Sequence, residues 1–307
     1  MIKKGIVYCT TGSIHRIKSE GQFYDCRIKG KFRIKGIKST NPLAVGDKVS
    51  FVIEPKKDAE GIITSIETRQ NYIIRKSVNL SKQTHIIAAN IDQVFLMITL
   101  KTPQTFPAFI DRFLVTAQAY EINVVLLFNK IDIYNKEELN AMTSLKGVYQ
   151  KIGYECYEVV ATDSKTLDII DSKMKGKVSM FCGHSGVGKS TLVNALSPGL
   201  KLKTGMVSKQ NQQGQHTTTF AEMFDLGASR IIDTPGIKGF GLVGIKPKEL
   251  SGYFIEFALL KGGCKFNNCL HTTEPNCAIK EAIEEGEIAH SRYKSYLQLL
   301  EEDSLYR

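Results

Sequence analysis

The stretch "FCGHSGVGKSTLVN", residues 181–194, decides the fold of this chain. Within it Gly183, Gly188, Lys189 and Ser190 fit the pattern G-x-x-x-x-G-K-S, between an apolar strand-like run and a helix-forming segment. Backbone N–H groups of such a loop point at phosphate oxygens, and the positive end of the following helix adds to the attraction. The stretch therefore predicts a nucleotide phosphate site on an α/β domain.

Every residue of this phosphate loop is a candidate nucleotide contact. Lys189 would neutralise the outer phosphates and so assist catalysis, and Ser190 would ligate a magnesium ion. The candidate contacts are Gly183, His184, Ser185, Gly186, Val187, Gly188, Lys189, Ser190 and Thr191.

A second motif, "DTPG" at residues 233–236, ends another apolar strand. Asp233 is placed there to hold magnesium, and Gly236 to offer a backbone N–H to the γ-phosphate. The segment between the two motifs, residues 203–220, is polar and almost without apolar anchors, which is typical of a switch that nucleotide orders. One of its three consecutive threonines should complete the magnesium shell, and we favour Thr218.

The guanine-reading motif N-K-x-D is matched by Asn129, Lys130, Ile131 and Asp132, directly after the apolar run "NVVLLF". The Asp132 carboxylate can accept from the ring N–H and the exocyclic amine of guanine, whereas adenine would leave it unpaired. Lys130 would lie along the base, and Asn129 would tie neighbouring loops together. The four-residue pattern also fits a phosphate-loop ATPase or kinase that contains it by chance, and competition by ATP against GTP separates the two readings.

A further stretch, "VVAT" at residues 159–162, follows the next apolar strand. The backbone N–H of Ala161 or Thr162 could reach the guanine oxygen. All the loops of a GTPase are then present, but the guanine loop comes before the phosphate loop. Since a parallel sheet brings every such loop to the carboxyl ends of its strands, the site survives a cyclic rotation of the chain order. The sequence predicts a circularly permuted GTPase domain.

The rest of the chain divides into regions of different pattern. We predict a multidomain fold: an N-terminal β-barrel of oligonucleotide-binding (OB) type over 1–70, a central α/β phosphate-loop GTPase domain with circular permutation over 71–242, and a mostly helical zinc-binding domain over 243–307. The expected barrel strands are 5–9, 22–28, 32–37, 47–53 and 61–67, and the expected central helices are about 107–121, 136–151, 164–174 and 188–197.

Positive charge is concentrated in the predicted barrel. The chain has a formal charge of +10, and residues 1–69 hold 14 Lys and Arg against 7 Asp and Glu. Alternation along residues 26–36 would gather five cations on one face of a continuous strand, where nucleic acid could bind. An ordinary solvated barrel face is the alternative. The candidate RNA contacts are Arg27, Lys29, Lys31, Arg33 and Lys35.

Four metal-ligand side chains crowd into fourteen residues, in the spacing C-x4-C-x-H-x5-C. Three thiolates and an imidazole make a closed tetrahedral zinc site with no open position for a reactive water, so we predict one structural Zn²⁺. Its ligands would be Cys264, Cys269, His271 and Cys277. The other cysteines are scattered, which with the lack of a long apolar stretch favours a cytoplasmic protein without a membrane partner.

Taken together these motifs resemble the RsgA (YjeQ) family of circularly permuted GTPases. The resemblance covers essentially the whole chain, through the basic barrel, "NKID", "GHSGVGKST", "GQHTTT", "DTPG" and the Cys/His cluster. It implies an OB barrel that binds ribosomal RNA, and hydrolysis of GTP to GDP with Mg²⁺, stimulated by the small ribosomal subunit during its late maturation. We also predict a monomer.

One position departs from Ras-like GTPases. Ile237 stands where those enzymes carry the glutamine that orients the attacking water, so intrinsic hydrolysis should be slow. The resemblance points to His216 as the substitute, with a structural or RNA-contacting role as the alternative. Gln215 replaces the basic residue often found before that histidine in the family. Ile237 also permits a second function, an RNA-binding module whose nucleotide site does not turn over.

Overall fold

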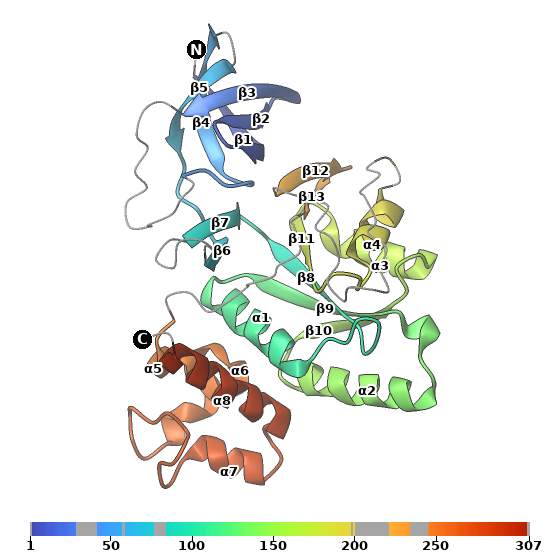
Figure 1. Ribbon diagram of the computed structural model, residues 1–307, viewed down its shortest axis with the longest axis vertical. Coiled ribbons are helices and arrows are strands. Elements are labelled where there is room, and N and C mark those ends of the chain that lie inside the picture. Colours follow the sequence, from blue (N-terminus) through green and yellow to red (C-terminus); the bar gives the residue numbers. More distant parts are fainter. Residues whose placement is uncertain are drawn as a thin grey trace.

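Separate hydrophobic cores form inside an N-terminal barrel, on each face of a central sheet and among the C-terminal helices. The structure is a computed structural model, and it describes residues 2–28, 42–56, 59–76, 84–197, 199, 221–233 and 245–305. Figure 1 shows the three regions in chain order, with the barrel at one end and the last helices at the other. Within the described residues no helix is long and apolar enough to cross a membrane.

Five strands form the N-terminal barrel. They are β1 (Ile2–Thr11), β2 (Ile14–Ser19), β3 (Gln22–Ile28), β4 (Lys48–Lys56) and β5 (Ala59–Ile66). Their order is β1-β2-β3-β5-β4, and β4 returns to pair with β1, which closes the barrel. Val7, Ile17 and Phe51 fill its interior. The predicted barrel is confirmed, but β2 was not among the predicted strands, and the predicted strand at 32–37 lies outside the described residues.

A two-stranded hairpin, β6 (Tyr72–Lys76) with β7 (Thr84–Ala89), follows the barrel and was not predicted. Ala88 makes an isolated bridge to Val45, so the hairpin lies against the barrel segment that precedes β4. Its short apolar runs give little periodic signal in the sequence.

The central sheet has the order β10-β9-β8-β11-β13-β12, parallel except for β12. Its strands are β8 (Gln93–Ile98), β9 (Asn123–Asn129), β10 (Glu155–Val159), β11 (Val178–Cys182), β12 (Glu222–Leu226) and β13 (Ser229–Asp233). β12 also pairs with β1 through Cys9 and Glu222, so sheet and barrel are joined edge to edge.

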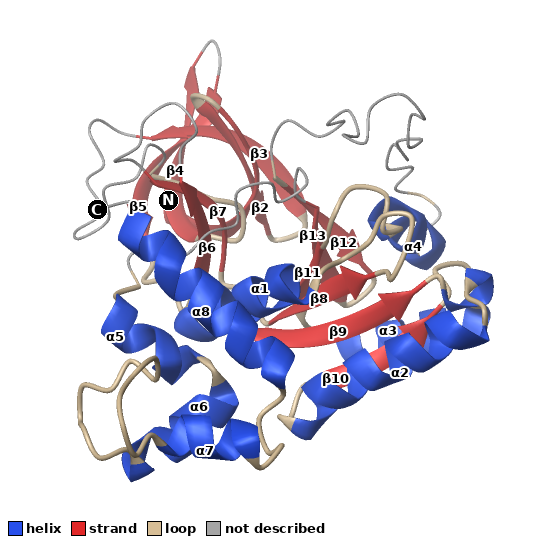
Figure 2. Ribbon diagram, turned by 60° about the horizontal axis from the view of Figure 1, so that its bottom comes forward, coloured by secondary structure: helices blue, strands red, loops and turns tan. Residues whose placement is uncertain are grey.

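Helices cover both faces of this sheet (Figure 2). They are α1 (Pro107–Ala119), α2 (Lys136–Lys151), α3 (Ser164–Met174) and α4 (Lys189–Leu196), with a short 3-10 turn, η1 (Ile131–Ile133). Alternate residues of one strand face opposite cores: Leu96 packs with α1 and α2, whereas Phe95 packs with α3 and α4. Burial on both faces explains why these strands read as continuous apolar runs.

The C-terminal region is helical around the cysteine cluster, as predicted. Its elements are α5 (Pro247–Leu250), η2 (Ser251–Tyr253), α6 (Ile255–Leu260), η3 (Lys261–Gly263), α7 (Ala278–Glu284) and α8 (His290–Leu305). Gly286, at φ +75°, separates α7 from α8 because few other residues adopt that backbone angle without strain. Helix α8 packs along α1, which attaches the region to the central sheet.

A buried ion network fixes this attachment. The Arg292 guanidinium on α8 donates to Asp111 on α1 at 2.6 Å and to Glu256 on α6 at 2.6 and 3.1 Å. Tyr149 on α2 donates to the same Asp111 oxygen at 2.9 Å. All four side chains are buried, so each depends on the others for its hydrogen bonds.

Candidate nucleotide site and metal site

The phosphate loop connects β11 to α4 and needs glycine at specific positions. Gly183 and Gly188 have φ of +140° and +105°, where a side chain is strained. A Cβ on Gly188 would lie 2.4 Å from Asn129 Nδ2, and one on Gly183 would lie 2.6 Å from the Met97 carbonyl. These glycines therefore let the loop pass close to the two neighbouring strands.

The Lys189 ammonium lies over its own loop. Its Nζ donates to the carbonyls of Gly183 at 2.8 Å and His184 at 2.6 Å. Burial lowers the pKa of Lys189, while the charge of Asp233 acts to raise it. Since Asp233 is the last residue of β13, and Ile232 pairs with Met180, this carboxylate lies at the same sheet edge as the loop. A bound phosphate would raise the same pKa further.

The guanine loop is bonded directly to the phosphate loop. Asn129 Nδ2 donates to the Val187 carbonyl at 2.7 Å, and Lys130 Nζ donates to the Gly186 carbonyl at 2.8 Å. The expected tie between loops is thus present, although their motifs lie fifty residues apart and in reversed order along the chain. Asp132 is the exposed middle residue of η1, and its side chain makes no hydrogen bond with a described residue.

Tyr134 anchors the guanine loop and was missed in the sequence. Its hydroxyl donates to the Asn129 carbonyl at 2.9 Å and accepts from the Leu100 N–H at 2.8 Å. The Tyr134 ring is buried, so these two bonds fix the guanine loop against the segment that follows β8. The signal in the sequence was an aromatic residue two positions after Asp132, which alone carries no such meaning.

The stretch at residues 159–162, expected to contact the guanine oxygen, lies beside the guanine loop. Val159 pairs with Asn129 in the parallel register of β10 and β9, so Ala161 and Thr162 follow at the same edge of the sheet. Thr166 Oγ1 accepts from the Val160 N–H, which holds the stretch in place.

His184 of the phosphate loop stacks against Phe109 of α1, with ring centres 3.9 Å apart. Its imidazole is therefore directed to α1, and any role for this residue toward phosphate falls to its backbone. Burial first, and then the charge of Lys189, lowers the pKa of His184.

Several predicted residues lie outside the described part of the chain. These are the switch residues His216, Thr218 and Gly236 and the barrel cations Lys29, Lys31, Arg33 and Lys35. Arg27 is described, as an exposed residue near the end of β3.

The Cys/His cluster has the dimensions of a metal site. The ligand atoms of Cys264, Cys269, His271 and Cys277 all lie within 4.8 Å of one another. Sγ of Cys264 is 4.0 Å from Sγ of Cys277, and Nδ1 of His271 is 3.4 Å from the latter. Zn–S bonds of about 2.3 Å in a tetrahedron require sulfur atoms about 3.8 Å apart, so the donor set fits this ion.

Two tyrosines of α8 support the cluster. Tyr296 donates to the Leu270 carbonyl and Tyr293 to the His271 carbonyl, both at 2.7 Å. Glu274 accepts from the N–H groups of Leu270 and Thr272, both at 2.8 Å. The ligand loop is thereby held from two sides.

A phosphate loop and a guanine loop joined at one edge of a parallel sheet, with the guanine strand first in the chain, define a circularly permuted GTPase. The RsgA GTPase family model matches residues 66–243, and the RsgA N-terminal domain model matches residues 4–63. The chain belongs to the RsgA family of GTPases, and it is a GTP hydrolase.

Relatives match over nearly the whole length. The small ribosomal subunit biogenesis GTPase RsgA of Christiangramia forsetii is 61% identical over 308 residues, covering 99% of this chain and 98% of that protein. The protein of the same name from Flavobacterium johnsoniae is 61% identical over 302 residues, covering 97% and 93%.

Two solved structures are similar. YjeQ from Thermotoga maritima has a TM-score of 0.79 at 33% identity, covering 98% of each chain. YloQ, described as a circularly permuted GTPase, has a TM-score of 0.75 at 28% identity, covering 100% of this chain and 96% of that one.

Proposed function

We propose that this GTPase binds GTP and a magnesium ion at the carboxyl edge of the central sheet, and that it acts in late maturation of the small ribosomal subunit. The observation that carries the nucleotide site is the pair of bonds from Asn129 to Val187 and from Lys130 to Gly186. Because the two loops share these contacts, one ligand can be held by both its base and its phosphates.

At the base, the Asp132 carboxylate would accept from the ring N–H and the amine of guanine. The N–H of Ala161 or Thr162 would donate to the guanine oxygen, and Lys130 would lie along the ring. ATP presents a donor where guanine has an acceptor, so it would leave these groups unpaired.

At the phosphates, the N–H groups of residues 184–190 would donate to oxygens and Lys189 would balance the charge. A magnesium ion would supply further neutralisation of the β- and γ-phosphates. Ser190, Thr218 and Asp233 would hold it, and the Gly236 N–H would meet the γ-phosphate.

Hydrolysis requires a water held in line with the leaving phosphate. Ile237 lacks a polar group for this, and His216 is the candidate, since a neutral imidazole can accept the water's proton. His216 would be placed beside the water when the protein binds a ribosomal subunit. The free protein would lack this group at the site and would hydrolyse GTP slowly.

The Cys/His cluster would hold one Zn²⁺ through Cys264, Cys269, His271 and Cys277, with a structural role. The ion would stabilise a region that contains only short helices besides α8.

The proposed partner is the small ribosomal subunit, which the names of the 61% identical relatives specify. The basic barrel, including Arg27, would contact its RNA. The protein would act in the cytoplasm as a monomer, bound to the subunit in the GTP state and released after hydrolysis.

Multiple-turnover phosphate release, measured with and without small subunits, tests this function. We expect slow release alone and strong stimulation by subunits, with tighter subunit binding in a non-hydrolysable GTP analogue than in GDP. Binding without any stimulated turnover would favour an RNA-binding module over an enzyme.

Base selection is tested by Asp132→Asn. Loss of a charged hydrogen-bond acceptor should reduce guanine affinity about 10- to 100-fold, measured by displacement of a fluorescent GDP analogue. Asp168→Asn, an exposed carboxylate on α3, is the matched control and should leave affinity unchanged. Equal affinities for the two variants would contradict the assigned role.

A further inference from the structure

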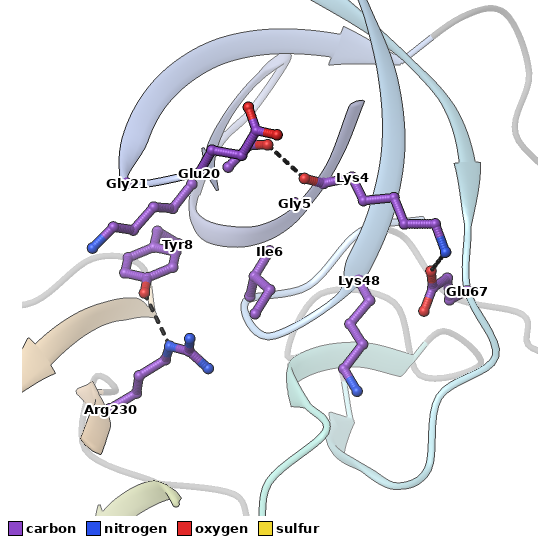
Figure 3. A pocket seen from close by; sticks show the side chains of 11 residues that line it. Lys4, Gly5, Ile6, Tyr8, Glu20, Gly21, Lys48, Glu67 and Arg230 are labelled. Carbon is purple, nitrogen blue, oxygen red and sulfur yellow. Dashed lines mark hydrogen bonds and ion pairs between the residues drawn. The ribbon is translucent and has the colours of Figure 1, made fainter. Parts of the chain in front are cut away.

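A cavity of about 510 Å³ lies where the barrel meets the central sheet (Figure 3). It is lined by strands β1, β2 and β4 of the barrel and by Arg230 of β13. Its charged lining residues are the cations Lys4, Lys18, Lys48 and Arg230 and the carboxylates Glu20 and Glu67. The motifs described above do not involve this cavity.

Its carboxylates are already neutralised. Glu67 pairs with Lys4 at 3.2 Å, and Glu20 pairs with Lys3, just outside the cavity, at 2.7 Å. Lys18 pairs with Asp225 of β12. Nε of Arg230 lies 3.8 Å from the same Asp225 carboxylate, and Lys48 is the remaining cationic side chain of the lining.

The Lys48 ammonium and the Nη groups of Arg230 have donors to offer. Lys48 is exposed, and its side chain makes no hydrogen bond or ion pair with a described residue. Arg230 donates from Nε to the Tyr8 hydroxyl at 3.1 Å, which orients the guanidinium, and its Nη groups bond to no described residue. Figure 3 shows the two side chains on either side of Ile6, beside the same opening. An oriented guanidinium and an unpaired ammonium suit the oxygens of a phosphate.

The neighbouring cleft has the opposite charge. Beyond Tyr8, it is lined by Asp25, Glu60, Glu222 and Asp225, with Arg16 as its cation. The carboxylates of this cleft repel anions, so an anion that binds between the barrel and the central sheet is favoured in the cavity with Lys48. Phe23, also beyond Tyr8, is 50% exposed, and Lys18 Nζ lies 5.5 Å from its ring centre. Phe23 lines this acidic cleft and not the cavity with Lys48, so it is not a contact of that cavity.

We propose that this cavity binds backbone phosphates of RNA, with Lys48 and Arg230 as the principal donors. The proposal rests on the proposed function, since it locates part of the RNA partner's contact surface. A single strand can enter a recess between two domains, which the broad surface of a lipid bilayer cannot. Arg230 lies on β13, three residues before Asp233, so RNA here would contact the strand that carries a proposed magnesium ligand.

The test is the affinity of the full-length protein for a fluorescent single-stranded RNA of roughly 20 nucleotides, measured by anisotropy over a series of salt concentrations. Lys48→Gln and Arg230→Gln should each weaken binding about three- to tenfold. Each should also reduce the slope of log affinity against log salt by about 0.7, the value for one lost phosphate contact. Arg16→Gln removes one positive charge from the opposite cleft and should change neither quantity.

A structural effect is separated by Tyr8→Phe, which removes the hydroxyl that orients Arg230 without changing charge. Its salt slope should equal that of the wild type. An unchanged slope in Lys48→Gln, or an equal loss in Arg16→Gln, would overturn the proposal. So would displacement of RNA by equimolar pyrophosphate, which indicates a free-anion site, or binding to anionic vesicles in place of RNA. GTP hydrolysis stimulated by small subunits is measured separately on the wild type. A failure of the proposed function is thereby distinguished from a failure of the RNA site in the cavity.

Discussion

Replacing Arg292 with leucine should strongly destabilise the attachment of the C-terminal helices. The variant leaves Asp111 and Glu256 buried without their shared guanidinium, from which they accept at 2.6 Å each. Removing one partner of a buried ion pair typically costs about 3–5 kcal/mol, because the remaining charge stays desolvated. At roughly 2–4 °C per kcal/mol, the melting temperature should fall by roughly 6–20 °C.

Circular dichroism is the suitable assay, since the chain has no tryptophan. The matched control is Lys173→Gln, which breaks an ion pair with Glu155 of similar length, 2.6 Å, but with both side chains about a third to a half exposed. Solvent screens that pair, so its loss should cost only a small fraction of the Arg292 effect.

The pH dependence gives an independent check. Burial raises the pKa of Asp111, against the opposing effect of Arg292. The Asp111 carboxyl group therefore stays protonated to a higher pH in the folded chain than in the unfolded chain. Between these two pKa values the stability of the fold falls as pH rises. Without Arg292 the interval extends to higher pH, so the destabilisation should be larger at pH 8 than at pH 5. Equal melting temperatures for Arg292→Leu and Lys173→Gln would refute the reasoning. So would a destabilisation by Arg292→Leu that is larger at pH 5 than at pH 8.

Two further substitutions test the guanine loop and the metal cluster. Tyr134→Phe leaves the Leu100 N–H without its acceptor, which should cost about 1–3 kcal/mol and speed release of a fluorescent GDP analogue. Tyr157→Phe, which loses a bond to exposed Glu155, is its control, and equal release rates would count against a loop-anchoring role. Cys277→Ser should lower both bound zinc, measured by atomic absorption, and the melting temperature, because three ligands cannot close the site. Cys9→Ser should keep the zinc content of the wild type, and zinc retained at full stoichiometry in Cys277→Ser would show that the cluster is not the site.

Local signals predicted the helices of the central domain well. The expected bounds of α2 and α3 agree with the structure because each begins at a side-chain cap, Asn135 and Asp163 respectively. Gly286 is also a local signal, because its positive φ ends a helix before α8 begins. Such features depend on neighbours in sequence and are therefore readable from it.

Features that depend on distant contacts were not predictable in this way. Arg292 reads as a solvent-exposed charge in an amphipathic helix, and only the packing of α8 on α1 buries it. Strand β2 mixes His15 and Ser19 into its buried face, which weakens the alternation that marks a strand. The N-K-x-D motif pointed to Asn129 as a tie between loops, whereas the role of Tyr134 depends on the fold, which brings Leu100 beside it.

The central claim is that two loops in reversed chain order hold one nucleotide. A crystal structure of the protein with a non-hydrolysable GTP analogue and magnesium measures this directly. We expect the guanine edge against the Asp132 carboxylate and the outer phosphates against Lys189 in the same molecule of ligand. Phosphates bound at Lys189 with the base lying away from Asp132 would contradict the account.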